Sequence, residues 1–114
     1  MLNRDFPERD WKYLSKIKPD TLNALCLRIR KRVEGIIYAP DKTEHEKYLG
    51  LYRYIQNSDD LVALCFNDWR RSTIEMKLWP LLRHGLLERE HIQNLSDETQ
   101  ALVCRISADL PRKA

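Results

Sequence analysis

Residues 59–83 read DDLVALCFNDWRRSTIEMKLWPLLR, and the fold that we expect depends on this stretch. Apolar side chains recur along it at spacings of three and four residues, which is typical of a helix packed against other helices. Pro80 lies within the stretch and Gly85 follows it. We therefore expect one helix from Asp59 to Arg83 or His84, kinked near Pro80 and ended by Gly85.

The apolar side chains of this expected helix fall on two sides. At about 100° per residue, one side carries Leu61, Cys65, Trp69, Ser72 and Met76, with Val62 and Phe66 beside them, and the opposite side carries Ile74, Leu78 and Leu81. A surface helix has a single apolar stripe, so a helix with two is central in its fold or part of an interface. We predict a long central helix, the fourth in the chain. From its stripe and that of residues 21–37 we expect these residues in the core: Leu25, Ile29, Val33, Cys65, Trp69 and Met76.

Amphipathic segments precede this helix. A first short helix, capped by Asp5, is expected to end at Pro19, and residues 21–37 carry the clearest one-sided apolar stripe of the chain. Thr43 and Glu46 fit a capping box that opens a third helix, in which the hydroxyl and the carboxylate each bond a free backbone N–H. Asn57-Ser58 is expected to end that helix, with Ser58 capping the next.

Two further helices are expected after Gly85. One is short, over residues 88–95, and Ser96 opens the last, which carries Leu102, Val103 and Ile106. Residues 110–114 are expected to form a frayed tail. The sequence thus predicts one all-α domain over residues 1–114, a compact bundle of five or six helices with a long central fourth helix.

The composition narrows the class of protein. The 114 residues are 43% hydrophobic and 32% charged, with only 3 Gly and 5 Pro for turns. No apolar run approaches the ~18 residues of a membrane span, and residues 1–5 carry no apolar signal core. Cys26, Cys65 and Cys104 are isolated, so we expect reduced core residues in a cytoplasmic protein and no membrane partner.

No motif for catalysis or cofactor binding stands out. The three histidines form no metal pair with another His or Cys at helical spacing, and three glycines leave no phosphate loop. We expect no catalytic residue, no cofactor and no metal site, although a site of three cysteines brought together in space stays open. These observations favour a non-catalytic protein, and an enzyme stays an open alternative.

Three groups of residues are candidate sites. The first is a polar site of Asp68, Arg71 and Glu75, whose spacing makes them neighbours on one helix. It is interpreted as a salt-bridge ladder with an Asp68–Arg71 ion pair, or alternatively as a site where Arg71 binds an anion.

The second candidate site is a basic surface on the solvent side of residues 21–37, made of Arg28, Arg30, Lys31 and Arg32. The first forty residues carry nine Lys and Arg against five Asp and Glu. Such a face suits a nucleic-acid backbone, an acidic protein or a membrane surface, but it is also the ordinary outer face of a surface helix.

The third is a possible homodimer interface of Ile74, Leu78, Leu81 and Tyr54. Tyr48 and Tyr52 are expected to be half buried at the rim of the core. From these patterns we expect a small non-catalytic binding or regulatory module that acts through protein–protein contacts, with a protein or a second copy as partner. The alternative is a nucleic-acid-binding protein that uses the basic outer face of the second helix.

Overall fold

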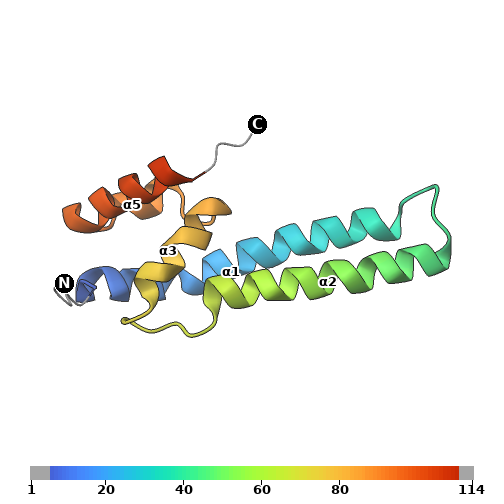
Figure 1. Ribbon diagram of the computed structural model, residues 1–114, viewed down its shortest axis with the longest axis horizontal. Helices are drawn as coiled ribbons and strands as arrows, with labels where there is room; N and C mark the ends of the chain where they lie inside the picture. The colour runs from blue at the N-terminus through green and yellow to red at the C-terminus, as the bar shows by residue number, and fades with distance from the viewer. Residues whose placement is uncertain (1–5, 111–114) are drawn as a thin grey trace.

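The computed structural model describes residues 6–110, and in this range the chain is helical and has no strand. The helices are α1 (Glu8–Ile37), α2 (Glu44–Phe66), α3 (Ile74–Arg83), α4 (Arg89–Gln93) and α5 (Asp97–Asp109). Figure 1 shows that α1 and α2 form a long hairpin, while α3, α4 and α5 gather at one end of it, the base. The all-α prediction is confirmed; Asp5 and residues 111–114 lie outside the described range.

α1 is one helix where two were predicted, because it continues through Pro19. Proline has no amide hydrogen, so the Ser15 carbonyl lacks its usual donor. In the following turn the Thr21 hydroxyl donates to the carbonyls of Ile17 and Lys18, at 3.2 and 3.0 Å. Leu14 and Leu25 are buried on either side of the proline. Packing of both halves of α1 against the same core therefore outweighs the local preference for a break.

α2 begins as predicted and ends later. In the capping box the Thr43 amide donates to Glu46 Oε1 at 2.8 Å, and the Glu46 amide donates to Thr43 Oγ1 at 3.1 Å. The helix then continues through Asn57 and Ser58, so the predicted break there is wrong. Ser58 is buried in the interior of α2 and lines a hollow with Leu25 of α1, so it does not cap a helix.

The predicted long fourth helix is wrong, because residues 59–83 are divided between the end of α2 and the whole of α3. Between them Asp68 has a φ of 54°, a left-handed conformation that Asp adopts more readily than most residues. The loop is held by its own side chains: Thr73 Oγ1 accepts from the Arg70 amide at 3.2 Å and donates to the Asp68 carbonyl. These contacts fix the change of direction between the two helices.

This break explains why the stretch had two apolar sides. Cys65 and Phe66 face the core from α2, whereas Ile74, Leu78 and Leu81 face it from α3, and all five are buried. The expected interface of Ile74, Leu78 and Leu81 is therefore part of the core of this chain and presents no exposed apolar patch. Tyr54, the fourth residue of the expected interface, is half-buried on α2. That the protein associates with a second copy stays a prediction.

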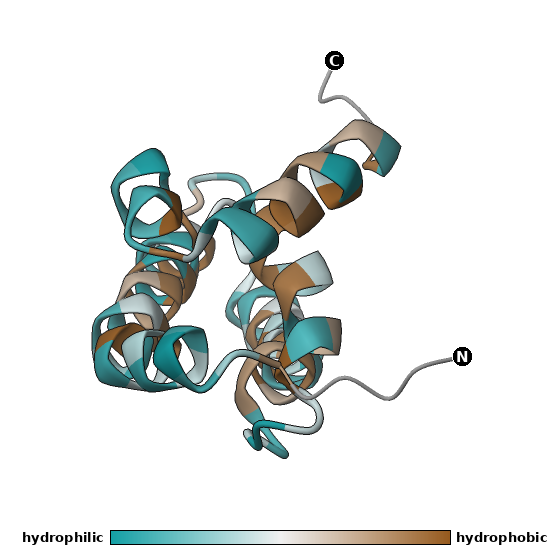
Figure 2. Cartoon of the chain, turned by 90° about the vertical axis from the view of Figure 1, so that its left-hand side faces the viewer, coloured by the Kyte–Doolittle hydropathy of each residue, from teal (hydrophilic) through white to brown (hydrophobic). Residues whose placement is uncertain are grey.

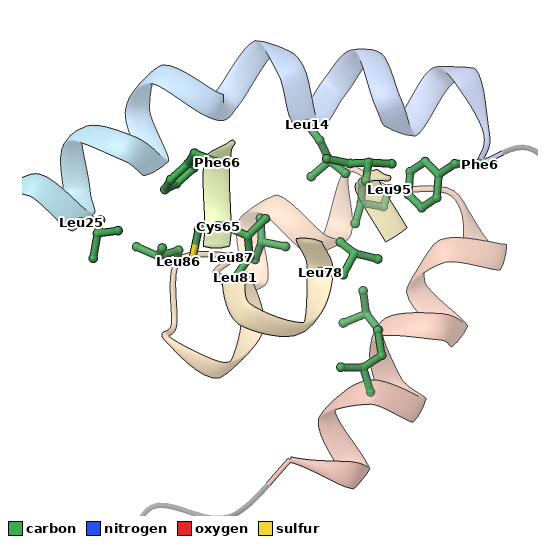
Figure 3. Packing of buried hydrophobic residues seen from close by; sticks show 13 residues of the cluster. Phe6, Leu14, Leu25, Cys65, Phe66, Leu78, Leu81, Leu86, Leu87 and Leu95 are labelled. Carbon is green, nitrogen blue, oxygen red and sulfur yellow. The ribbon is translucent and has the colours of Figure 1, made fainter. Parts of the chain in front are cut away.

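The core lies at the base of the hairpin, around α3 (Figure 3). Seen from that end, the apolar segments of the helices turn toward a common interior (Figure 2). Of the predicted core residues, Leu25 and Cys65 are buried and Ile29, Val33 and Trp69 are partly buried. Met76 is 71% exposed, because the buried stripe of α3 is that of Leu78. Cys26 and Cys104 are exposed, so the prediction that all three cysteines are core residues is wrong.

A buried carboxylate ties α5 to α1. Asp10 is fully buried and accepts hydrogen bonds from the Ser96 amide at 2.8 Å, from the Ser96 hydroxyl at 2.6 Å and from the Thr99 hydroxyl. Ser96 is the N-cap of α5, so the carboxylate lies at the positive end of that helix dipole. A buried charge needs such partners, and these partners lie more than eighty residues away in sequence.

An aromatic cluster holds the loop between α2 and α3 against α1. The Trp69 ring lies 6.3 Å from that of Trp11 and is stacked on that of Phe66 at 5.9 Å, measured between centroids. Its indole N–H donates to Ser15 Oγ at 3.1 Å. The cluster closes the base of the hairpin on the side of this loop.

The orientation of α3 can be tested with two substitutions of similar size. Leu78→Ala removes a fully buried side chain and is expected to lower the free energy of unfolding by about 2–5 kcal/mol. Met76→Ala, two residues earlier, changes an exposed side chain and is expected to alter it by less than about 0.5 kcal/mol. Urea denaturation followed by circular dichroism measures both, and equal losses would contradict the orientation.

Asp10→Ala is expected to destabilise the protein by on the order of 3 kcal/mol, because the Ser96 amide and two hydroxyls lose a charged acceptor in a buried place. The matched control is Asp20→Ala, at an exposed position of the same helix. Amide hydrogen exchange in Asp10→Ala is expected to rise first in α5. An α5 that stays as protected as in the parent protein would contradict the tie between the two helices.

Candidate functional site

The predicted polar site of Asp68, Arg71 and Glu75 is not assembled as expected. Asp68 pairs with Arg70, whose Nε and Nη2 donate to the two carboxylate oxygens at 2.6 and 3.1 Å. The hydrogen bond from Arg70 lowers the pKa of Asp68. The predicted Asp68–Arg71 ion pair is wrong, because the helical spacing on which it rested is lost where the backbone turns at Asp68.

Arg71 has a structural role at the start of α1. Its Nε donates to the Phe6 carbonyl, and its Nη1 lies 3.8 Å from Glu8 Oε1. Glu75 is exposed and lines a small surface hollow of about 130 Å³ with Phe6 and Arg105. These contacts fasten the loop after α2 to the first turn of α1 and leave no common anion site for the three predicted residues.

The four predicted basic residues also separate. Arg28 donates to the carbonyls of His84 and, at 3.1 Å, Gly85, so it caps the C-terminal end of α3. Arg30 pairs with Glu34 one turn later in α1. Lys31 and Arg32 are exposed. The expected continuous basic face is thus reduced to the latter two residues.

Arg32 belongs instead to a hollow of about 500 Å³ between α1 and α2, at the end of the hairpin far from α3. Three other cations line it: Lys42 from the connecting loop, and Lys47 and Arg53 from α2. We call these four residues and the space between them the basic hollow. No pattern in the sequence predicted this hollow, because it forms only where α1 and α2 meet, with Gly50 beside Ile36.

Positive charge exceeds negative charge in the basic hollow. Glu46 is the one acidic residue that lines it, and hydrogen bonds from Thr43 and, less strongly, the charge of Lys42 lower the pKa of this carboxyl. Lys47 Nζ lies 3.5 Å from Glu44 Oε2. Within residues 6–110, Arg32, Lys42 and Arg53 form no ion pair.

The other flank of α2 is apolar and open to solvent. Tyr48, Tyr52 and Ile55 follow one another at helical spacing and are 64%, 57% and 48% exposed. By helical register Ile37, at the end of α1, lies on the same side of the hairpin and is also exposed. We call these four residues the aromatic flank. The expectation that Tyr48 and Tyr52 are half buried is wrong.

The aromatic flank is the open half of a stripe that is covered elsewhere. The register of Tyr48 and Ile55 continues along α2 to Val62 and Phe66. Phe66 is buried under Trp69, and Val62 is partly buried. Because α3, α4 and α5 lie only at the base (Figure 1), the same stripe is left uncovered toward the loop between α1 and α2.

The histidines and cysteines form no evident reactive centre. Among the described residues no three His, Cys, Asp or Glu side chains come together in a way that could hold a metal ion. His91 Nδ1 accepts a hydrogen bond from the Glu88 amide at the start of α4, which is a structural contact. Burial raises the pKa of the Cys65 thiol.

No protein-family model, no curated protein and no solved structure matches this chain. No helix in residues 6–110 is long and apolar enough to cross a membrane. The features from which a function can be inferred are the two flanks of the hairpin.

The different roles of Arg28 and Arg32 can be tested with the same substitution at both positions. Arg28→Gln is expected to lower the free energy of unfolding by about 1–3 kcal/mol, since the carbonyls of His84 and Gly85, just after α3, lose a charged donor. Arg32→Gln removes the same charge from the same helix without such a contact and is expected to change it by less than about 0.5 kcal/mol. Equal effects in urea denaturation would contradict the capping role.

Proposed function

We propose that this protein is a small, non-catalytic binding module that contacts a protein partner through the aromatic flank. The observation that carries the proposal is the exposure of Tyr48, Tyr52 and Ile55 on a stripe that is buried at its other end. Contiguous exposed apolar side chains on a folded protein mark interaction surfaces. Tyrosine is enriched at such surfaces because it supplies contact area at low entropic cost.

The spacing of the exposed side chains on α2 favours a partner that is helical where it binds. The exposed residues of α2 recur at helical spacing and so form a ridge, the complement of an apolar groove or of a second amphipathic helix. Ile37 widens this ridge toward α1. A partner with an apolar helical face therefore fits the surface, and it is either a second copy of this chain or another protein.

The nucleic-acid alternative has less support. Of its four residues, Arg28 donates to carbonyls at the end of α3, and Glu34 partly offsets the charge of Arg30. Lys31 and Arg32 alone make a small footprint. Titration of the protein with a short oligothymidylate, described below, tests this alternative.

Site-specific photo-crosslinking in the native cell tests the proposal. A photoreactive phenylalanine at position 52 lies on the aromatic flank, and one at Lys16 lies at an exposed position of α1 near the base. We expect a discrete adduct from position 52 that position 16 does not give. An adduct of twice the chain mass identifies a second copy, and any other discrete mass identifies a different protein.

A pair of substitutions serves as the specificity control. Ile55→Asp puts a charge on the aromatic flank, one helical turn from Tyr52, and is expected to remove the adduct, whereas Leu64→Asp changes an exposed apolar residue on another side of α2 and is expected to leave it. With a purified partner, Tyr52→Ala is expected to weaken the affinity about tenfold or more. Adducts that are the same from positions 16 and 52, or that survive Ile55→Asp, would refute the proposal.

A further inference from the structure

The basic hollow lies across α2 from the aromatic flank, and the binding of a protein partner does not account for it. We propose that it binds a phosphate-bearing small molecule of about the size of a nucleotide. The proposal rests on the charges that meet there, on the space between them and on the mixed character of the lining.

Cations from three segments converge on the hollow. Arg32 comes from α1, Lys42 from the loop, and Lys47 and Arg53 from α2. Like charges held near one another repel, so the arrangement favours an anion that several of them contact together. Arginine offers a planar fork of donors and lysine a compact charge, and both groups commonly bind phosphate.

The hollow has room for such a ligand. Its volume of about 500 Å³ lies in the range of small-molecule sites. Gly35 and Gly50 line it, and a Cβ added at Gly35 would meet no atom within 4 Å. Side chains therefore surround the space without filling it.

The lining also favours an organic phosphate over an inorganic ion. Ile36 and Leu49 supply apolar surface next to the cations, which suits a ligand with a ring or chain attached to its phosphate groups. The four lining cations come from three segments and gather around one hollow. This favours a small molecule over the backbone of a nucleic acid, which needs a longer track of contacts.

Isothermal titration calorimetry at low ionic strength tests the proposal with three probes: ATP, adenosine and a short oligothymidylate. ATP supplies phosphates with an organic group, adenosine supplies the organic group alone, and the oligothymidylate supplies phosphates in a strand. We expect ATP to bind, adenosine to bind at least about tenfold more weakly, and added salt to weaken the ATP complex.

Two kinds of variant locate the site. Arg32→Gln with Arg53→Gln removes two of its charges and is expected to weaken ATP binding about tenfold or more. Arg83→Gln with Arg89→Gln removes two exposed charges elsewhere and is expected to leave it unchanged. Gly35→Leu changes no charge but fills the open space, and it is expected to block ATP; leucine is also a better helix former than glycine, so the fold is retained.

Three results would overturn the proposal. The first is an absence of ATP binding to the parent protein. The second is an equal loss in the two double variants, which would mean attraction by net charge alone. The third is an oligothymidylate that binds more tightly than ATP and loses affinity in the Arg32 and Arg53 double variant, which would assign the hollow to nucleic acid. Circular dichroism of each variant checks that it is folded.

Discussion

The turn at Asp68 is the constraint on which the remaining architecture depends. α2 ends at Phe66, the left-handed backbone of Asp68 then turns the chain, and Thr73 donates to the Asp68 carbonyl so that α3 starts in a new direction. Had the helix continued, Leu78 and Cys65 would lie on different sides of one rod and could not share a core. With the turn, both are buried at the base of the hairpin.

The turn at Asp68 also allows the base of the hairpin to be closed. Once α3 lies across the hairpin, α5 packs against it, and the carboxylate of Asp10 fixes the start of α5 to α1. Trp69, in the loop between α2 and α3, covers Phe66. Packing and buried hydrogen bonds are thus concentrated at one end of the molecule, where segments distant in sequence meet.

The far half of the hairpin is left without cover, and this is where both proposed surfaces lie. α2 presents Tyr52 on one flank and Arg53 on the other, so one helix separates an apolar ridge from a charged hollow. Apolar contact and phosphate binding rest on different forces, and salt weakens the second far more than the first. The two surfaces can therefore be changed one at a time.

Local patterns in the sequence determined the helical class, the capping box at Thr43 and the shared side of Ile74, Leu78 and Leu81, because these depend on residues a few positions apart. The register also indicated that residues 59–83 could not be an ordinary surface helix. Only the tertiary structure decided that α1 passes Pro19, that α2 passes Asn57 and that Arg28 caps α3 while Arg32 faces a hollow. Local preferences for a break amount to about 1–3 kcal/mol, and burial of side chains against distant segments outweighs them.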